Sequence, residues 1–160
     1  MKRIVTSVIA AALMLCLLCG CSKNTADPDM QDVADAVAAA VNVDADSMSQ
    51  TPENYVSDVM LIDPTCYEIR NTFMSAVGTN IDEYGIFKAT SKENADKIAD
   101  ALNTYIDYRK GAWMDEYMPD EKPKLDNAEV WQQGSYVMYV ILGDDARQAA
   151  HDAFSSCFEG

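Results

Sequence analysis

One short stretch near the start of the chain has residue types and a spacing that suit a defined covalent chemistry. It runs Leu18, Cys19, Gly20 and Cys21. A signal peptidase of the lipoprotein type takes a large aliphatic residue three positions before the cut, a small residue directly before it and a cysteine directly after it. The cysteine thiol then carries a diacylglycerol as a thioether, and two acyl chains make membrane attachment stable. The spacing predicts cleavage between Gly20 and Cys21 and lipidation of Cys21.

The residues before this motif have the organisation of a signal peptide. Lys2 and Arg3 form a positive start, and residues 8–18 form an apolar run of the length typical of such segments. A membrane-spanning helix needs about 20 apolar residues, so a cleaved start is favoured over a permanent transmembrane helix. The expected division is a lipoprotein signal peptide at 1–20, a lipidated cysteine with a short tether at 21–28, and a single α+β domain at 29–160.

The charge balance limits the partners that this protein can have. The chain has 26 acidic and 12 basic side chains and a net charge of −14, and removal of Lys2 and Arg3 would make the net charge −16. Phosphates of nucleic acids and anionic lipid headgroups would be repelled by such a surface. We therefore expect no nucleic-acid partner, and attachment to the extracytoplasmic face of the cell membrane through the lipid anchor alone.

The cysteine and histidine content argues against a metal site or a cofactor. After Cys21 the chain has only Cys66 and Cys157, and its one histidine is His151. This is too few for a site built from several histidines and cysteines, and we expect neither a metal nor a cofactor. Export permits a disulfide between Cys66 and Cys157, but their spacing does not show that they meet. Cys157 falls on the apolar face of a predicted helix, which favours a buried free thiol.

Hydrophobic periodicity and turn residues predict an α+β fold. Ser91 opens the longest predicted helix with a capping-box pattern, and Pro119 follows its end. Segment 56–62 fits either a buried strand or a single helical turn, and 44–54 is polar and loop-like. The expected elements are helices at 29–42, at 91–117 and from Asp144 or Asp145 onward, and strand pairs at 67–77 with 81–89 and at 128–132 with 135–142.

These elements fit a four-stranded antiparallel sheet built from two β-hairpins. An N-terminal helix, the long central helix and a C-terminal helix would pack on it. Segment 135–142 is apolar at both odd and even positions, which is typical of a central strand buried on both faces.

Four segments together resemble a known bacterial family. They read IDEYGIFKA at 81–89, WMDEYMP at 113–119, LDNAEV at 125–130 and GSYVMYVI at 134–141. The chain from 30 to 158 is similar to an uncharacterised lipoprotein family typical of Firmicutes, domain of unknown function 4358. The resemblance implies a lipid-anchored exterior protein. It implies no activity, cofactor or catalytic residue, so Cys21 is the only site residue that it supports.

Two classes of function remain for the domain itself. Aromatic residues are frequent on the long predicted helix and the second hairpin, and Trp113 and Trp131 would line a groove if these elements pack together. We therefore expect a non-catalytic binding or accessory module, with an envelope protein as its partner. The alternative is an envelope-acting hydrolase that uses paired carboxylates. The nearby acids Glu116 and Asp120 are better explained as a solvated helix end.

The lipidation motif is tested by metabolic labelling with a fatty-acid probe. We expect the wild-type protein to be labelled and to fractionate with membranes, and Cys21→Ala to abolish both. Cys19→Ala is the matched control, because alanine is common at that position of the motif, and it should leave the labelling unchanged. Equal labelling of wild type and Cys21→Ala would contradict the prediction.

Overall fold

The computed structural model describes residues 27–43, 45–114 and 116–159, and in this part of the chain the fold is mixed α+β. Five α-helices, five strands and two short 3₁₀ turns follow one another along it. Their order is α1 (Met30–Val41), η1 (Ala45–Ser47), β1 (Met48–Gln50), α2 (Glu53–Asp58), η2 (Pro64–Cys66), β2 (Tyr67–Ser75), β3 (Glu83–Ala89), α3 (Lys92–Ala112), α4 (Lys122–Asp126), β4 (Glu129–Gln133), β5 (Tyr136–Ile141) and α5 (Asp144–Ser156).

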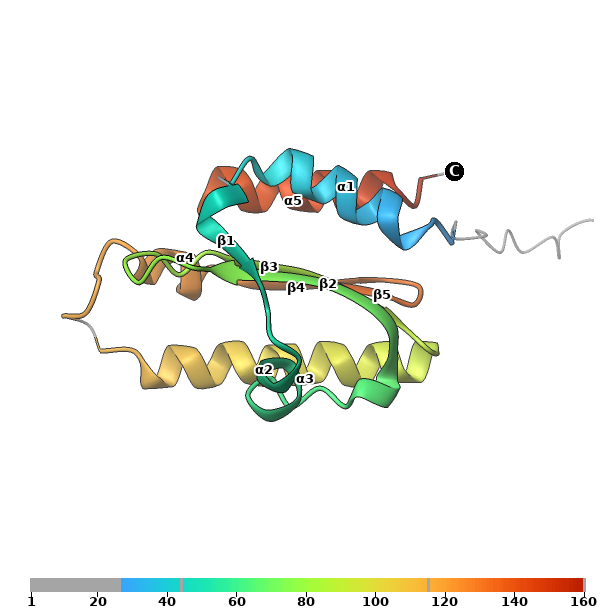
Figure 1. Ribbon diagram of the computed structural model, residues 1–160, viewed down its shortest axis with the longest axis horizontal. Helices are drawn as coiled ribbons and strands as arrows, with labels where there is room; N and C mark the ends of the chain where they lie inside the picture. The colour runs from blue at the N-terminus through green and yellow to red at the C-terminus, as the bar shows by residue number, and fades with distance from the viewer. Residues whose placement is uncertain (1–26, 44, 115, 160) are drawn as a thin grey trace, which may run out of the picture.

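The strands form one antiparallel sheet that is covered by helices on both faces. The strand order is β1-β2-β3-β5-β4, and every neighbouring pair is antiparallel. Helices α1 and α5 lie side by side on one face, and α3 lies on the other face with α2 beside it (Figure 1). Strands β3 and β5 occupy the middle of the sheet, so their side chains are buried above and below it.

The sheet divides the hydrophobic core into two clusters. Phe87, Leu102 and Tyr139 belong to the cluster on the α2 and α3 side. Val37 and Met138 belong to the cluster on the α1 and α5 side. Successive β5 residues alternate between the two clusters because successive strand side chains point to opposite faces. This confirms the prediction that 135–142 contains a central strand.

The helix starts are set by side-chain caps that the sequence makes recognisable. Asp29 accepts a hydrogen bond of 2.7 Å from the amide of Gln31 and caps α1. Ser91 accepts a hydrogen bond of 3.1 Å from the amide of Asn94 and caps α3. Both caps satisfy amides that the first helical turn leaves without a partner. The predicted starts of these two helices are therefore confirmed to within one residue.

The sheet has five strands, so the prediction of four was wrong by one. The additional strand β1 is three residues long and pairs with β2, with Met48 opposite Ser75 and Gln50 opposite Phe73. It lies in the segment 44–54 that the sequence indicated to be a loop. Two of its three residues are exposed, so it has no apolar pattern of its own. It is a strand because β2 offers its outer edge for pairing.

The ends of other elements also differ from the prediction. Helix α3 ends at Ala112 rather than at Tyr117, because Trp113 takes an extended backbone with φ −70° and ψ 133° and packs against the core. Segment 53–58 is helical, so the helical alternative holds for the first residues of 56–62. The short helix α4 lies between 117 and 128, where neither a helix nor a strand was expected.

The packing of α3 against the sheet predicts a large effect of a buried charge on its inner face. Leu102 is fully buried in the core cluster between α3 and the sheet. We expect Leu102→Asp to lower the free energy of unfolding by more than about 3 kcal/mol, because it buries a carboxylate without a partner. The measurement is chemical denaturation at neutral pH. Asn103→Asp, on the exposed side of the same helix, should stay within about 0.5 kcal/mol of wild type. Similar unfolding curves for both variants would show that α3 does not pack through Leu102.

Candidate functional site

A buried carboxylate marks the face of the sheet that α3 covers. Glu83, the first residue of β3, has a relative exposure of only 1%, and it is the only charged residue buried to this degree in the described part of the chain. An ionised carboxylate in a protein interior is strongly destabilising unless it is paired and hydrogen-bonded. The surroundings of Glu83 therefore decide whether it is structural or chemical.

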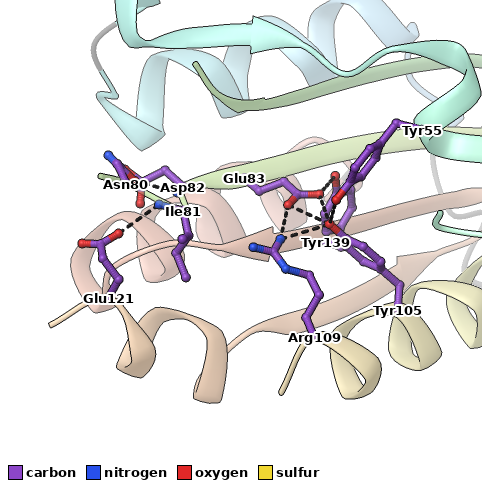
Figure 2. A network of polar contacts seen from close by, with 9 residues as sticks. All are labelled: Tyr55, Asn80, Ile81, Asp82, Glu83, Tyr105, Arg109, Glu121 and Tyr139. Carbon is purple, nitrogen blue, oxygen red and sulfur yellow. Dashed lines mark hydrogen bonds and ion pairs between the residues drawn. The ribbon is translucent and has the colours of Figure 1, made fainter. Parts of the chain in front are cut away.

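Three side chains from two elements surround the carboxylate. The hydroxyl of Tyr139 on β5 donates to it at 2.9 Å, and the hydroxyl of Tyr105 on α3 lies 3.0 Å from both of its oxygens. The guanidinium of Arg109, one turn further along α3, forms an ion pair with it. Arg109 also donates to the Tyr105 hydroxyl at 3.0 Å, and the hydroxyl of Tyr55 on α2 lies 2.9 Å from that same oxygen (Figure 2). We call these five residues the Glu83 network.

A glycine makes room for one arm of this network. Gly85 lies between Thr72 and Tyr139 in the sheet register. A Cβ atom at position 85 would lie 2.5 Å from Cγ2 of Thr72 and 2.7 Å from Cε1 of Tyr139, which is closer than such atoms approach. The missing side chain therefore lets the Tyr139 ring lie over β3 and place its hydroxyl at Glu83.

Burial and charge shift the pKa values inside the network in opposing ways. Burial raises the pKa of Glu83, and this outweighs Arg109 and the two tyrosine hydroxyls, which act to lower it. Burial acts to lower the pKa of Arg109, but the Glu83 carboxylate and the hydroxyls of Tyr105 and Tyr55 together outweigh it, and the pKa is raised. Burial, assisted by Glu83, raises the pKa of Tyr105 and Tyr139, so both phenols keep their protons. The phenols are therefore fixed donors.

Two further acids lie close together, one directly before β3 and the other directly before α4. Asp82 and Glu121 share Lys124, whose ammonium lies 2.8 Å from Oδ1 of Asp82 and 2.9 Å from Oε2 of Glu121. Glu121 also accepts from the amide of Ile81 at 3.0 Å. The side-chain amide of Asn80 donates to the Asp82 carboxylate and accepts from the Asp82 backbone amide (Figure 2). This carboxylate pair ties α4 to the start of β3. Its oxygens are held by a cation and a backbone amide, which is a structural arrangement.

A pocket opens between α3 and the segment that follows α2, beside the Glu83 network. Its volume is about 530 Å³, which lies within the range of ligand pockets. We call it the α2–α3 pocket. Its lining is mostly apolar and includes Val59, Met60 and Leu61 from the segment after α2, and Ala101, Tyr105 and Tyr108 from α3. Tyr105 belongs to both features: its ring lines the pocket and its hydroxyl binds Glu83.

The rim of this pocket exposes large apolar side chains to solvent. Leu61 is 69% exposed, Tyr108 is 71% exposed and Val59 is 44% exposed. Leu61 also has a positive φ of 57°, a left-handed conformation that is unfavourable for a branched side chain. Strain of this kind is frequent at functional sites. A strained, exposed leucine beside an apolar pocket is the strongest indication of a binding surface in the described residues.

The two tryptophans predicted to line one groove lie on opposite faces of the sheet. Trp113 packs against the core cluster on the α3 side, and its indole nitrogen is buried without a hydrogen bond in the described structure. Trp131, on β4, packs on the α5 side and contacts the ring of His151 with centroids 5.0 Å apart. The described residues therefore do not form a groove lined by both. Glu116 and Asp120, which were expected at a solvated helix end, are both exposed but follow the end of α3 at Ala112.

Two pairs of residues from the sequence analysis remain: the two cysteines considered for a disulfide, and the two residues of the cleavage and lipidation site. Cys66 and Cys157 are free thiols that pack against different clusters on opposite sides of the sheet. The predicted cleavage and lipidation residues Gly20 and Cys21 lie outside the described residues. Within the described ranges, no group of three or more histidine, cysteine or acidic residues is placed to hold a metal ion. None of the helices there is long and apolar enough to cross a membrane.

Glu83 and the α2–α3 pocket were not identified from the sequence. A signal for Glu83 was present, because it alternates in phase with Phe87 and Ala89, which face the core. Tyr105 and Arg109 are likewise spaced i,i+4 on α3 and lie on neighbouring turns. The pocket had no such signal, because its two walls come from segments that are at least 40 positions apart.

The Glu83 network predicts a pH-dependent contribution to stability. The pKa of Glu83 is raised, so the folded protein binds this proton more tightly than the unfolded chain does. The contribution is fully present below the ordinary pKa of 4.5 and is lost as the pH rises through the folded value. We expect the unfolding free energy of wild type minus that of Glu83→Gln to fall as pH rises, measured by denaturation between about pH 4 and 8. A difference that grows with pH would mean that Arg109 dominates over burial.

Arg109→Met is the companion variant for this test. It keeps much of the side-chain length but leaves Glu83 buried without its cation, which should lower the unfolding free energy at neutral pH by about 3–5 kcal/mol. The double variant with Glu83→Gln should recover most of this loss, because no buried charge remains. Failure of the double variant to recover would show that Arg109 acts mainly through packing.

Comparison with known proteins identifies the family but no characterised relative. No curated protein and no solved structure gives a significant match. A family model described as a domain of unknown function, DUF4358, matches residues 42–142. The match includes the whole Glu83 network and the α2–α3 pocket, whereas α1 and α5 fall outside it. The chain therefore belongs to the DUF4358 family.

Proposed function

We propose that the protein is a lipoprotein anchored on the extracytoplasmic face of the membrane, where it acts as a non-catalytic binding or accessory module. The anchor rests on the sequence motif that ends at Cys21. The acidic surface supports this arrangement, because a domain of strong negative charge is repelled by anionic headgroups and stays in solution beside the membrane. The lipid then holds the domain near partners in the envelope.

The binding role rests on the α2–α3 pocket. It combines an apolar hollow with three exposed apolar side chains at its rim, Val59, Leu61 and Tyr108. Exposed apolar groups that gather in this way mark interaction sites more often than scattered ones do. The strained backbone of Leu61 keeps its side chain at the surface, where it contributes little to the core.

The carboxylates support binding better than hydrolysis. A hydrolase of the expected type needs two acids that face a substrate across a cleft. Glu83 is buried and faces a guanidinium, and Asp82 and Glu121 share a lysine ammonium. In each case the described structure already provides a structural partner for the acid.

Photo-crosslinking in intact cells tests this proposal. A benzoylphenylalanine residue is placed at Tyr108 in the full chain, and at Asp152 on the opposite layer as a control. Both positions are exposed, so neither change should affect folding. We expect a discrete crosslinked product from position 108 that is absent from position 152, with the partner identified by mass spectrometry. We also expect Cys21→Ala to reduce its yield, because the anchor raises the local concentration of the protein at the membrane.

The absence of a discrete product at position 108, or equal products at both positions, would contradict the proposal. Leu61→Asn is a further variant for the same assay. Asparagine tolerates positive φ better than leucine does, so the variant should be at least as stable as wild type and still crosslink less.

A further inference from the structure

The α2–α3 pocket has features that specify the chemistry of its occupant. Two hydroxyls of its lining are already engaged: the Thr104 hydroxyl donates to the carbonyl of Asp100 at 2.8 Å, and the Tyr105 hydroxyl belongs to the Glu83 network. Asp58 accepts from Ser57 at 2.8 Å. Pockets for small polar ligands hold convergent polar groups that fix orientation. Here the hydroxyls of Thr104 and Tyr105 are occupied, and Asp58 and Tyr108 are exposed to solvent. The pocket is suited to apolar side chains.

The shape of the site favours a helical segment over an extended one. The α3 wall consists of Ala101, Thr104, Tyr105 and Tyr108, which form one stripe along about two helical turns, roughly 10 Å. No strand contributes to the lining, so an extended peptide finds no sheet edge with which to pair. A helix binds such a groove by inserting apolar side chains spaced i, i+3, i+4 and i+7.

The charges around the pocket favour a basic partner. Asp58 lies in the lining, and Asp100 and Asp107 follow on the solvent side of the α3 stripe; all three are exposed. Two cations of α3 lie next to the pocket stripe, Lys97 one turn before Ala101 and Arg109 one turn after Tyr105. Each is already paired with an acid, Lys97 with Glu93 and Arg109 with Glu83. With a net charge of −14, a second copy of this chain would be repelled, whereas lysine and arginine side chains would be attracted.

We propose that the α2–α3 pocket binds a basic amphipathic helix of a protein partner, with apolar side chains inserted beside Leu61 and Tyr108 and basic side chains placed near Asp58, Asp100 and Asp107. This inference rests on the proposed binding function and specifies the chemistry of its partner. The raised rim, formed by Val59, Leu61 and Tyr108, surrounds the inserted side chains and excludes water from them.

Binding of defined peptides to the full chain tests the inference. The protein is held in phosphatidylcholine nanodiscs, and empty nanodiscs give the background. The probe is a fluorescent peptide of about 15 residues with leucines on one helical face and lysines elsewhere. One control peptide has glutamate in place of lysine, and another has the same composition with the leucines spread around the helix. We expect saturable binding, followed by anisotropy, of the first peptide alone.

Variants separate the apolar contribution from the electrostatic one. Tyr108→Ser and Leu61→Asn should each raise the Kd by about tenfold, because each removes a large apolar contact at the pocket rim. Asp58→Lys and Asp107→Lys should raise the Kd several-fold at low salt, and this effect should fade at about 1 M salt. Asp152→Lys makes the same charge change on α5, and it should alter the Kd less than about twofold.

The outcomes distinguish this inference from the broader proposal. A discrete crosslink at position 108 in cells without binding of the basic peptide would overturn the basic-helix inference and leave the binding function intact. Peptide binding that is unaffected by Tyr108→Ser and Leu61→Asn would also overturn it, because binding would then be a general attraction to the acidic surface. Equal binding of the lysine and glutamate peptides would also overturn it, because the pocket would then have no preference for a basic partner. Failure of both the crosslink and the peptide would overturn the two proposals together.

Discussion

The burial of Glu83 is the constraint on which the arrangement of the other elements depends. A carboxylate in the interior is tolerated only if several donors meet it with correct geometry. The donors come from β5 and from two neighbouring turns of α3, and Tyr55 adds a contact from α2. A small shift of α3 along the sheet would break several of these contacts at once. Apolar packing is less directional, so the Glu83 network fixes a position that the apolar core alone would leave adjustable.

The sheet is adapted to this network at its centre. Strand β3 begins with Glu83 and then has Gly85, where a side chain would collide with Thr72 and Tyr139. A glycine in a strand is unfavourable by itself because it provides no side chain for packing. Here the space it leaves is filled by the Tyr139 ring, whose hydroxyl would otherwise not reach the carboxylate. The two positions therefore act together, and six of the seven β3 residues are buried despite the glycine.

The α2–α3 pocket depends on the same network. Tyr105 forms part of the pocket lining, and its hydroxyl contacts Glu83, Arg109 and Tyr55. This holds one wall rigid before any partner binds, and a preorganised wall reduces the entropy lost on association. The opposite wall is the short segment after α2, where Leu61 keeps a left-handed backbone and an exposed side chain. Stability and binding are thus separable: the network stabilises the fold, and the rim presents the apolar surface.

The sequence by itself determined those features that depend on near neighbours in the chain. Asp29 and Ser91 cap helices whose amides lie two or three residues away, and the alternation along 135–142 shows a strand buried on both faces. The motif that ends at Cys21 is equally local, and the prediction of a lipid anchor rests on the sequence alone. Only the tertiary structure decided which acid of the described residues is buried, because the donors of Glu83 lie 22 to 56 positions away. It also recruited β1 to the sheet edge, placed Trp113 and Trp131 on opposite faces, and formed the pocket from two distant segments. Hydrophobic periodicity records which side of an element is buried, but it does not record which elements meet, and both the Glu83 network and the α2–α3 pocket form where elements meet.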